Sequence, residues 1–287
     1  MKYLIYILFF IPFFTKAQDM SFAFKGSSTI TRNKLPVAVC YSVRRIVDKY
    51  SGYCLQVRRS SDNTTQDIGF TANGDLDTTA LKSFVGSGNG YVTIWYDQSG
   101  YGRNATQSTT TAQPTIVNSG TVQRSNGQPS ILFNGTSQTM ASTAFGLINQ
   151  PFTRNEIINI KSSSTSLHYI NSSGGSPNAG LLTLLSNSIT IYAGTIVNSM
   201  QTFTINTTYI FSDMFNGASS ALYKNGTSSG NYNIGTGGVN GVQIASYDGS
   251  SYYTNIAVSE ITLFNNMLSS TDRQALEANQ NRYYKIF

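Results

Sequence analysis

The sequence is poor in the residues that build metal centres. Its 287 residues include one histidine and two cysteines, and no Cys-x-x-Cys pair occurs. Structural zinc sites need several Cys or His ligands at short spacings, so the sequence argues against a zinc protein and predicts no metal site of that kind. His168, being alone, is more typical of a strand residue than of a ligand or a general base.

Charged residues are also scarce, at 11% of the chain, and the net charge is +6 at pH 7. A positive balance can indicate a nucleic-acid or anionic-polymer partner. The basic residues of the first third come without any nucleic-acid motif, so we interpret them as a solvated face and expect no nucleic-acid partner. They are Arg44, Arg45, Lys49, Arg58 and Arg59.

Long apolar runs are missing beyond the first residues. Lys2 precedes an apolar stretch from Tyr3 to Phe14, and Thr15-Lys16-Ala17 supplies small residues where a signal peptidase reads. We therefore expect a signal peptide over residues 1–17, with no transmembrane anchor after cleavage. The remaining 287 − 17 = 270 residues, 18–287, contain no evident linker and are expected to form one domain, secreted or at the cell surface.

Hydroxyl, amide and aromatic residues are abundant instead. The chain has 18 tyrosines and 25 glycines, and Ser, Thr and Asn supply much of the rest. Such surfaces suit sugars, whose hydroxyls form hydrogen bonds and whose C–H faces stack on rings. The alternative is an extracellular sheet whose outer faces are merely polar.

Helical periodicity is confined to short segments. A helix is predicted over Val37 to Ser51, where apolar residues recur at helical spacing before Gly52. Cys40 and Cys54 would then lie at opposite ends of this helix, too far apart for a disulfide, so two buried free thiols are favoured. A second helix follows Asp77 and ends at Gly86, and a third can begin after Ser269, with Asp272 three residues later.

Most of the remaining chain alternates between apolar and polar residues in short runs separated by Gly, Asn and Ser. This pattern predicts an all-β fold, an antiparallel β-sandwich or jelly roll with a few short peripheral helices. The predicted strands are Val92 to Asp97, Ser130 to Asn134, Glu156 to Lys161, Ser188 to Ala193, Tyr209 to Asn216, Ala221 to Lys224, Val242 to Ser246 and Ala257 to Phe264.

Two signatures carry a family resemblance. Leu55 to Thr65 reads L-Q-V-R-R-S-S-D-N-T-T, and Ile94 to Gln107 reads I-W-Y-D-Q-S-G-Y-G-R-N-A-T-Q. Both resemble the opening half of the arabinofuranosidase B catalytic domain, a glycoside hydrolase that removes terminal α-L-arabinofuranose from plant polysaccharides. The resemblance is clearest over Tyr41 to Gln113.

The later motifs resemble those of a larger group of folds. Strand-turn motifs end in Asn134-Gly135 and in Asn225-Gly226, and Ser259 to Phe264 precedes the closing helix. This order is similar to that of concanavalin A-like and laminin-G-like sandwiches. The implied partner is a glycan, which in the resembled family is an arabinose-containing polysaccharide.

The resemblance also implies catalytic positions. A retaining arabinofuranosidase needs two carboxyls about 5 Å apart. Asp248, in a Gly-containing loop ahead of the strand with Glu260, matches the family's acid/base, although an ordinary Asp-Gly turn is an equal alternative and Glu260 is interpreted as structural. The family's nucleophile lies in an Asn-x-Glu pattern after a cysteine pair. Here Asn171 matches, but Ser173 stands in the glutamate position and the cysteine pair is absent, so the nucleophile is unknown.

Ligand-binding candidates come from the two opening signatures and from the loops. They are Asp97, Asn171, Asp62, Arg58 and Gln98, with Asn63 and Asn104 beside them. These oxygen-rich groups suit sugar hydroxyls, or calcium as the one cofactor candidate in a protein otherwise expected to need none. The alternative is that Asp62 and Asp97 only fix tight turns. We expect Asp97, Asn171 and Asp248 to line one cleft, joined by at most one of Arg58 and Arg59, whereas Trp95 is expected in the core.

Three functional hypotheses follow. The first is a secreted carbohydrate-recognising sandwich that binds glycan without efficient hydrolysis, because the nucleophile is missing. The second is an active α-L-arabinofuranosidase with Asp248 as acid/base. The third is a structural or adhesive module of a surface or a virion.

Overall fold

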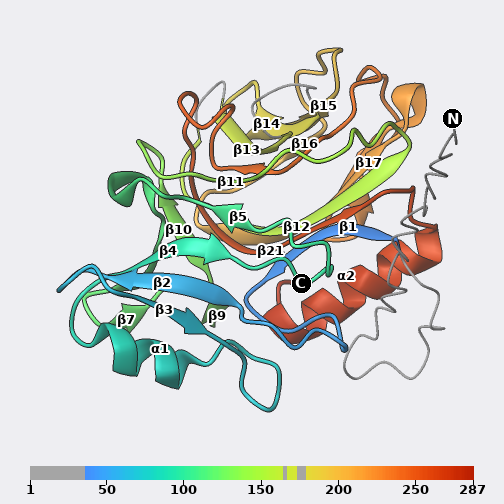
Figure 1. Ribbon diagram of the computed structural model, residues 1–287. Helices are drawn as coiled ribbons and strands as arrows, with labels where there is room; N and C mark the ends of the chain where they lie inside the picture. The colour runs from blue at the N-terminus through green and yellow to red at the C-terminus, as the bar shows by residue number, and fades with distance from the viewer. Residues whose placement is uncertain (1–35, 164–166, 173–178) are drawn as a thin grey trace, which may run out of the picture.

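The computed structural model describes residues 36–163, 167–172 and 179–287. The described chain is mostly antiparallel β-structure with two α-helices, which confirms the predicted all-β sandwich (Figure 1). The predicted signal peptide and Ser173 lie outside the described residues. In the described part, no helix is long and apolar enough to cross a membrane.

One sheet is centred on β21, the longest strand, which pairs with β12 along one edge and with β1 and β10 along the other. β12 continues the sheet to β17, β18 and β19. The strands are β1 (Val37–Ser42), β10 (Ile131–Asn134), β21 (Asn255–Phe264), β12 (Phe152–Ile160), β17 (Thr207–Phe215), β18 (Ala221–Lys224) and β19 (Thr227–Ser228).

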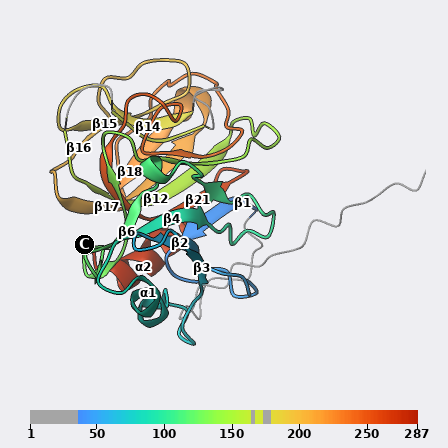
Figure 2. The same cartoon turned by 60° about the vertical axis from the view of Figure 1, so that its left-hand side comes forward.

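The other layer is built from shorter strands in the order β3, β2, β4, β5, β11, β20, β13, β14, β15 and β16. Their bounds are β3 (Thr65–Ile68), β2 (Leu55–Arg59), β4 (Gly90–Trp95), β5 (Ala105–Thr106), β11 (Met140–Ser142), β20 (Gln243–Ile244), β13 (Leu167–Asn171), β14 (Gly180–Thr183), β15 (Ser188–Tyr192) and β16 (Gln201–Thr202). Figure 2 shows β14 to β16 at the top and α1 at the bottom.

The two layers are joined at one side by β6 (Thr115–Asn118), which pairs with both β4 and β10. β7 (Thr121–Val122) and the hairpin of β8 (Arg124–Ser125) and β9 (Gln128–Pro129) follow it. The main hydrophobic core lies between the layers and includes Trp95, as predicted, packed 5.6 Å from the Tyr41 ring.

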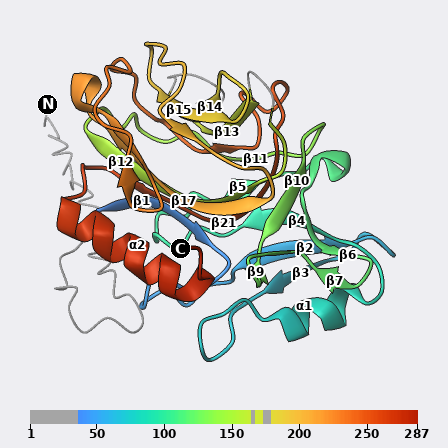
Figure 3. The ribbon, with the colours of Figure 1, turned by 180° about the vertical axis from the view of Figure 1, so that it is seen from behind.

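Both α-helices lie on the outside. Helix α1 (Thr78–Val85) is capped by the Asp77 carboxylate and followed by Gly86 in the left-handed region, as the sequence predicts. Helix α2 (Ser270–Tyr284) is capped by Ser269. It runs beside β1 and β17 on the face away from β13 to β15 (Figure 3). Two short 3-10 turns, η1 (Thr110–Ala112) and η3 (Gly217–Ser219), complete the described elements.

The predicted helix over Val37 to Ser51 is wrong. Val37–Ser42 forms strand β1, paired with β21, and the chain then bends through residues 43–50. Every residue of β1 is buried, because Val39 and Tyr41 face the main core while Val37 and Cys40 face α2. A strand buried on both faces gives a continuous apolar run, and periodicity alone cannot distinguish such a run from a helix.

The basic residues of the first third do not form one solvated face. Arg44 and Arg58 are buried, so that prediction is wrong for both. Arg44 donates from Nε to Glu260 at 2.8 Å and from Nη2 to Asn279 at 2.9 Å, which makes Glu260 structural, as expected. A buried guanidinium is retained where such acceptors meet it.

The two cysteines are free and buried, as predicted, although the helix on which that reasoning rested is absent. Burial raises the pKa of both thiols well above the ordinary value. Both are therefore neutral thiols at physiological pH and are poor nucleophiles.

Candidate functional site

Asp97 and Gln98 hold the loop after β4 against β1. The Asp97 side chain is 3% exposed and accepts hydrogen bonds from the backbone of Cys40 (2.9 Å), Ser99 (2.9 Å) and Arg103 (3.0 Å) and from the Ser99 hydroxyl (2.5 Å). Gln98 is also buried, and it bonds the backbone of three residues, Ser42, Arg44 and Ile46. These two side chains are therefore occupied in fixing the fold, and the alternative of an Asx turn describes Asp97 well.

Asp62 closes the turn between β2 and β3. It is exposed, pairs with Arg59 at 2.6 Å and accepts a hydrogen bond from the Thr64 backbone at 3.0 Å. The Arg59 guanidinium and the Thr64 donors hold the pKa of the Asp62 carboxyl well below its usual range. Asp62 is thus an ionised turn residue on the surface.

Arg58, on the other face of β2 from Arg59, lines a surface cavity of about 430 Å³. Its Nε donates to Gln113 at 2.6 Å and its Nη1 to Asn63 at 2.7 Å. The guanidinium lies 4.7 Å from the centre of the Tyr91 ring. The structure therefore places Arg58 away from Asp97, in a cavity of its own.

Asn171 and Asp248 come from neighbouring strands of the second layer. Asn171 ends β13, and Asp248 lies in the loop that follows β20, the strand paired with β13. The Asn171 amide donates to the Ser246 carbonyl at 3.0 Å, and its Oδ1 lies 3.2 Å from Nδ1 of His168. The Asp248 carboxylate acts electrostatically on the same histidine. Of the proposed cleft residues, Asn171 and Asp248 are therefore brought together.

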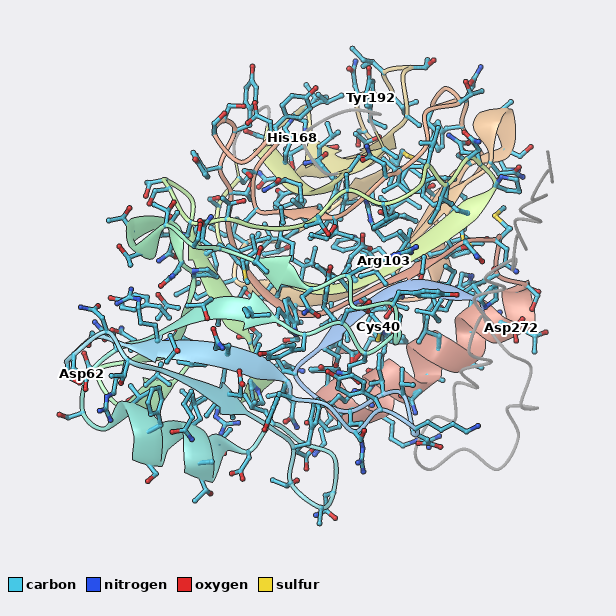
Figure 4. All side chains as sticks on the ribbon, in the orientation of Figure 1. Cys40, Asp62, Arg103, His168, Tyr192 and Asp272 are labelled. Carbon is cyan, nitrogen blue, oxygen red and sulfur yellow. The ribbon has the colours of Figure 1, made fainter. Side chains whose placement is uncertain are left out.

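Asp97 does not join them. It is bonded to Cys40, and Figure 4 shows Cys40 next to α2, while His168 lies in the opposite layer. The hydrogen-bond partners of the two carboxylates differ, since Asp97 binds Cys40, Ser99 and Arg103 while Asp248 binds Ser250 and Ser251.

The Asp248 carboxylate is exposed and caps its own loop. Its Oδ1 accepts four hydrogen bonds at 2.9 Å, from the backbone and the hydroxyl of both Ser250 and Ser251. These donors lower the pKa of Asp248. A general acid needs a pKa near the working pH, so this environment favours an ionised carboxylate that accepts hydrogen bonds.

Three aromatic rings surround this position, and the sequence reasoning missed two of them. The His168 ring lies 4.8 Å from Tyr247 and 5.4 Å from Tyr252, and the two tyrosines are 6.1 Å apart. Tyr252 is 54% exposed. We call His168, Tyr247 and Tyr252 the aromatic cluster. Two tyrosines flanking the Asp-Gly turn were the available signal.

Burial lowers the pKa of His168, so its ring is neutral near pH 7. A neutral imidazole stacks and exchanges hydrogen bonds without adding charge. With Asn171 and Asp248 at its side, the aromatic cluster combines ring faces with polar acceptors, the two kinds of group that a neutral sugar needs.

Two carboxylates lie close together inside the sandwich, where no local sequence pattern indicates them. Arg154 on β12 donates to its neighbour Glu156 and, from Nη2, to its cross-strand partner Asp213 at 2.5 Å. All three side chains are buried. Burial and the nearby Asp213 raise the pKa of Glu156 well above its usual value. In this structure the three side chains of this buried triad are closed off from solvent.

Within residues 36–163, 167–172 and 179–287, no group of three or more His, Cys, Asp or Glu side chains could hold a metal ion. The calcium alternative therefore finds no cluster of carboxylates there, and Asp62 and Asp97 lie in separate turns.

Comparison with known proteins agrees with this architecture. The family described as "Alpha-L-arabinofuranosidase B, catalytic" matches residues 31–155. A GH54 α-L-arabinofuranosidase soaked with a cyclic sulfate inhibitor superimposes with a TM-score of 0.70 at 16% identity, covering 85% of this chain and 62% of that one. An arabinofuranosidase complexed with arabinofuranosyl-α-1,2-xylobiose gives 0.64 at 17% identity with the same coverage. The fold is that of these arabinofuranosidases.

The sequence similarity is more local than the structural one. Alpha-L-arabinofuranosidase B of Aspergillus niger is 39% identical over 72 residues, and that of Aspergillus oryzae is 39% identical over the same length. The match covers 25% of this chain and 14% of each relative. A similarity this local supports relatedness to arabinofuranosidase B and leaves the activity to the site residues.

Proposed function

We propose that this chain is a secreted carbohydrate-recognising sandwich, related to arabinofuranosidase B, that binds glycan at the aromatic cluster without efficient hydrolysis. Its fold and its opening half are similar to those of arabinofuranosidases. The substrate class that those names print makes an arabinose-containing glycan the first ligand to test.

The contacts around Asp248 support recognition. Tyr252 presents an exposed ring, and Tyr247 and His168 back it at stacking distances. Asn171 is buried and fixed by Ser246, so its orientation is set before a ligand arrives. A pre-organised aromatic and amide surface binds sugars at a low cost in conformational entropy.

The protonation state of the Asp248 carboxyl is the observation on which the proposed lack of efficient hydrolysis rests. Two carboxyls in different protonation states are needed for retaining hydrolysis. The hydrogen bonds from Ser250 and Ser251 lower the pKa of Asp248 and favour its ionised form, whereas a general acid has to be protonated. An ionised Asp248 supports a role as acceptor for a sugar hydroxyl.

Two measurements on the full chain test this function. Calorimetric titration with arabinan and arabinoxylan oligosaccharides should show binding that Tyr252→Ala weakens about three- to tenfold, because one stacked ring contributes roughly 0.5–1.5 kcal/mol. Tyr101→Ala, at a similarly exposed tyrosine outside the cluster, is the matched control.

The second measurement is release of nitrophenol from a chromogenic α-L-arabinofuranoside. We expect no release above the level of Asp248→Asn. Turnover that Asp248→Asn abolishes would replace the proposal with the active enzyme. Absence of binding to every arabinose-containing oligosaccharide at millimolar concentration would reject recognition at this site.

A further inference from the structure

Arg58 differs from the other buried arginines of the described chain. Arg44 pairs with Glu260, Arg154 with Asp213, and Arg273 with Glu277 at 2.5 Å. Arg58 is as buried as Arg44, at 8% exposure, yet its acceptors are neutral. They are the Gln113 amide, the Asn63 amide and the Thr110 carbonyl at 3.3 Å.

This difference leaves a positive charge without a counterion. A buried charge is normally paired, because its transfer from water costs far more than neutral acceptors and a ring face return. The Tyr91 ring, 4.7 Å away, offsets part of that cost. In the described part of the chain no carboxylate lines the cavity, since Asp62 faces Arg59.

The guanidinium also has donors to spare. It carries five N–H groups, and the three contacts use one each from Nε, Nη1 and Nη2. Two N–H groups, one on each terminal nitrogen, are not used by these three contacts. A guanidinium with N–H groups to spare can donate them to the oxygens of an anion.

The walls of the cavity suit a sugar. Beside Arg58 they carry the amides of Asn63, Gln113 and Gln138 and the threonines Thr110 and Thr111, which are exposed at the rim. Its volume of about 430 Å³ lies in the range of small-ligand sites. Amide and hydroxyl groups at fixed positions are the partners that sugar hydroxyls use.

We propose that the Arg58 cavity binds the anionic group of an acidic saccharide, a uronic-acid carboxylate or a sulfate ester, with the amides and threonines holding the sugar. This second site is independent of the aromatic cluster, so either proposal can fail without the other.

The test is calorimetric titration of the full chain with a galacturonic acid trisaccharide, its methyl ester and a sulfated galactose oligosaccharide. We expect at least one acidic probe to bind, with affinity that falls as salt rises and about tenfold or more on methyl esterification of the carboxylate probe. Binding of only one acidic probe identifies which anion the site takes.

Variants locate the site. Arg58→Gln should weaken binding of the acidic probe about tenfold or more. Thr111→Glu adds a negative charge at the exposed rim and should weaken binding to the same extent, without changing a buried side chain. Arg59→Gln, on the opposite face of the same strand, and Tyr252→Ala, in the aromatic cluster, should leave it unchanged. Thermal unfolding checks that Arg58→Gln is folded. If Arg58→Gln does not fold, the affinity of Thr111→Glu alone decides whether the Arg58 cavity is the site.

Three outcomes overturn the proposal. One is that no acidic probe binds at millimolar concentration. Another is that the methyl ester binds as tightly as the free acid while the sulfated probe does not bind. The third is that Thr111→Glu and a folded Arg58→Gln both bind normally.

Discussion

Two aspartates in two loops each accept four hydrogen bonds but lie in opposite environments, Asp97 buried and Asp248 exposed. Asp97, after β4, and Asp248, after β20, each accept four hydrogen bonds from nearby backbone and serine groups. One contact of Asp97 reaches across to Cys40 on β1, and its carboxylate is buried. The four hydrogen bonds of Asp248 come from Ser250 and Ser251 in its own loop, and its carboxylate is exposed to solvent.

The comparison separates the scaffold from the surface that can bind a ligand. The family match over residues 31–155 includes Asp97, Gln98 and Arg58, and the first two only hold the fold together. The aromatic cluster lies outside that range. The most family-like part of the chain is therefore chiefly informative about folding, and function has to be argued from loops that resemble the family least.

The largest expected effect is on stability. Asp97→Ala would leave three backbone N–H groups without their acceptor, two of them buried (Cys40 and Ser99) and one partly buried (Arg103). An unsatisfied buried donor costs about 1–3 kcal/mol, so we expect a loss of about 3 kcal/mol or more in the free energy of unfolding, measured by urea denaturation.

Asp248→Ala is the matched control. Water can replace its contacts, so a loss within about 1 kcal/mol is expected. Equal losses in the two variants would contradict the division between scaffold and surface.

The buried triad gives a pH-dependent effect on stability, which again arises inside the fold. The pKa of Glu156 is raised in the folded protein, because its carboxyl is buried beside Asp213. The folded state therefore keeps a proton that the unfolded chain releases above about pH 4.3. The contribution of Glu156 to the free energy of unfolding is fully present below that pH. It falls as the pH rises toward the folded pKa of Glu156, by up to about 1.4 kcal/mol per pH unit.

Urea unfolding of the wild type and Glu156→Gln between pH 4 and 8 measures this contribution. Glutamine cannot ionise, so its stability should fall less steeply with pH. The lowered pKa of Asp248 gives the opposite pH dependence, because the stability that Asp248 contributes is lost as the pH falls below about 4. Parallel pH profiles for wild type and Glu156→Gln would show that Glu156 is ionised in the fold.

The sequence predicts the fold better than the site because turns and caps are local. Asp77, Ser269 and the turn at Asn225-Gly226 work within a few residues, and all lie where they were expected. Strand β1 was mistaken for a helix because its second apolar face is buried by α2, from the other end of the chain.

The site depends on pairings that no local pattern reveals. The aromatic cluster forms because β13 pairs with β20, which brings His168 to a loop about 80 residues later. The buried triad forms because Arg154 lies opposite Asp213 in the β12–β17 ladder. Arg58 was identified as a binding candidate, but it lies opposite Tyr91 near one end of the β2–β4 ladder. Asp97 follows Trp95, which lies opposite Leu55 at the other end.

The smallest stability effect belongs to Tyr252, where ligand binding and folding can be separated. Tyr252 has φ = 52°, in the left-handed region that disfavours side chains with a Cβ, and its ring is exposed. Tyr252→Gly removes the ring and the strain together, while Tyr252→Ala removes the ring and keeps the strain. We therefore expect Tyr252→Gly to be up to about 1 kcal/mol more stable than Tyr252→Ala in urea unfolding, with both variants binding arabinose-containing oligosaccharides equally weakly. If glycine instead proved the less stable of the two, the left-handed backbone would not be under strain. Wild-type affinity in both variants would show that the exposed loop does not bind the ligand. Asp248 could then no longer be contrasted with Asp97 as a residue of a binding site.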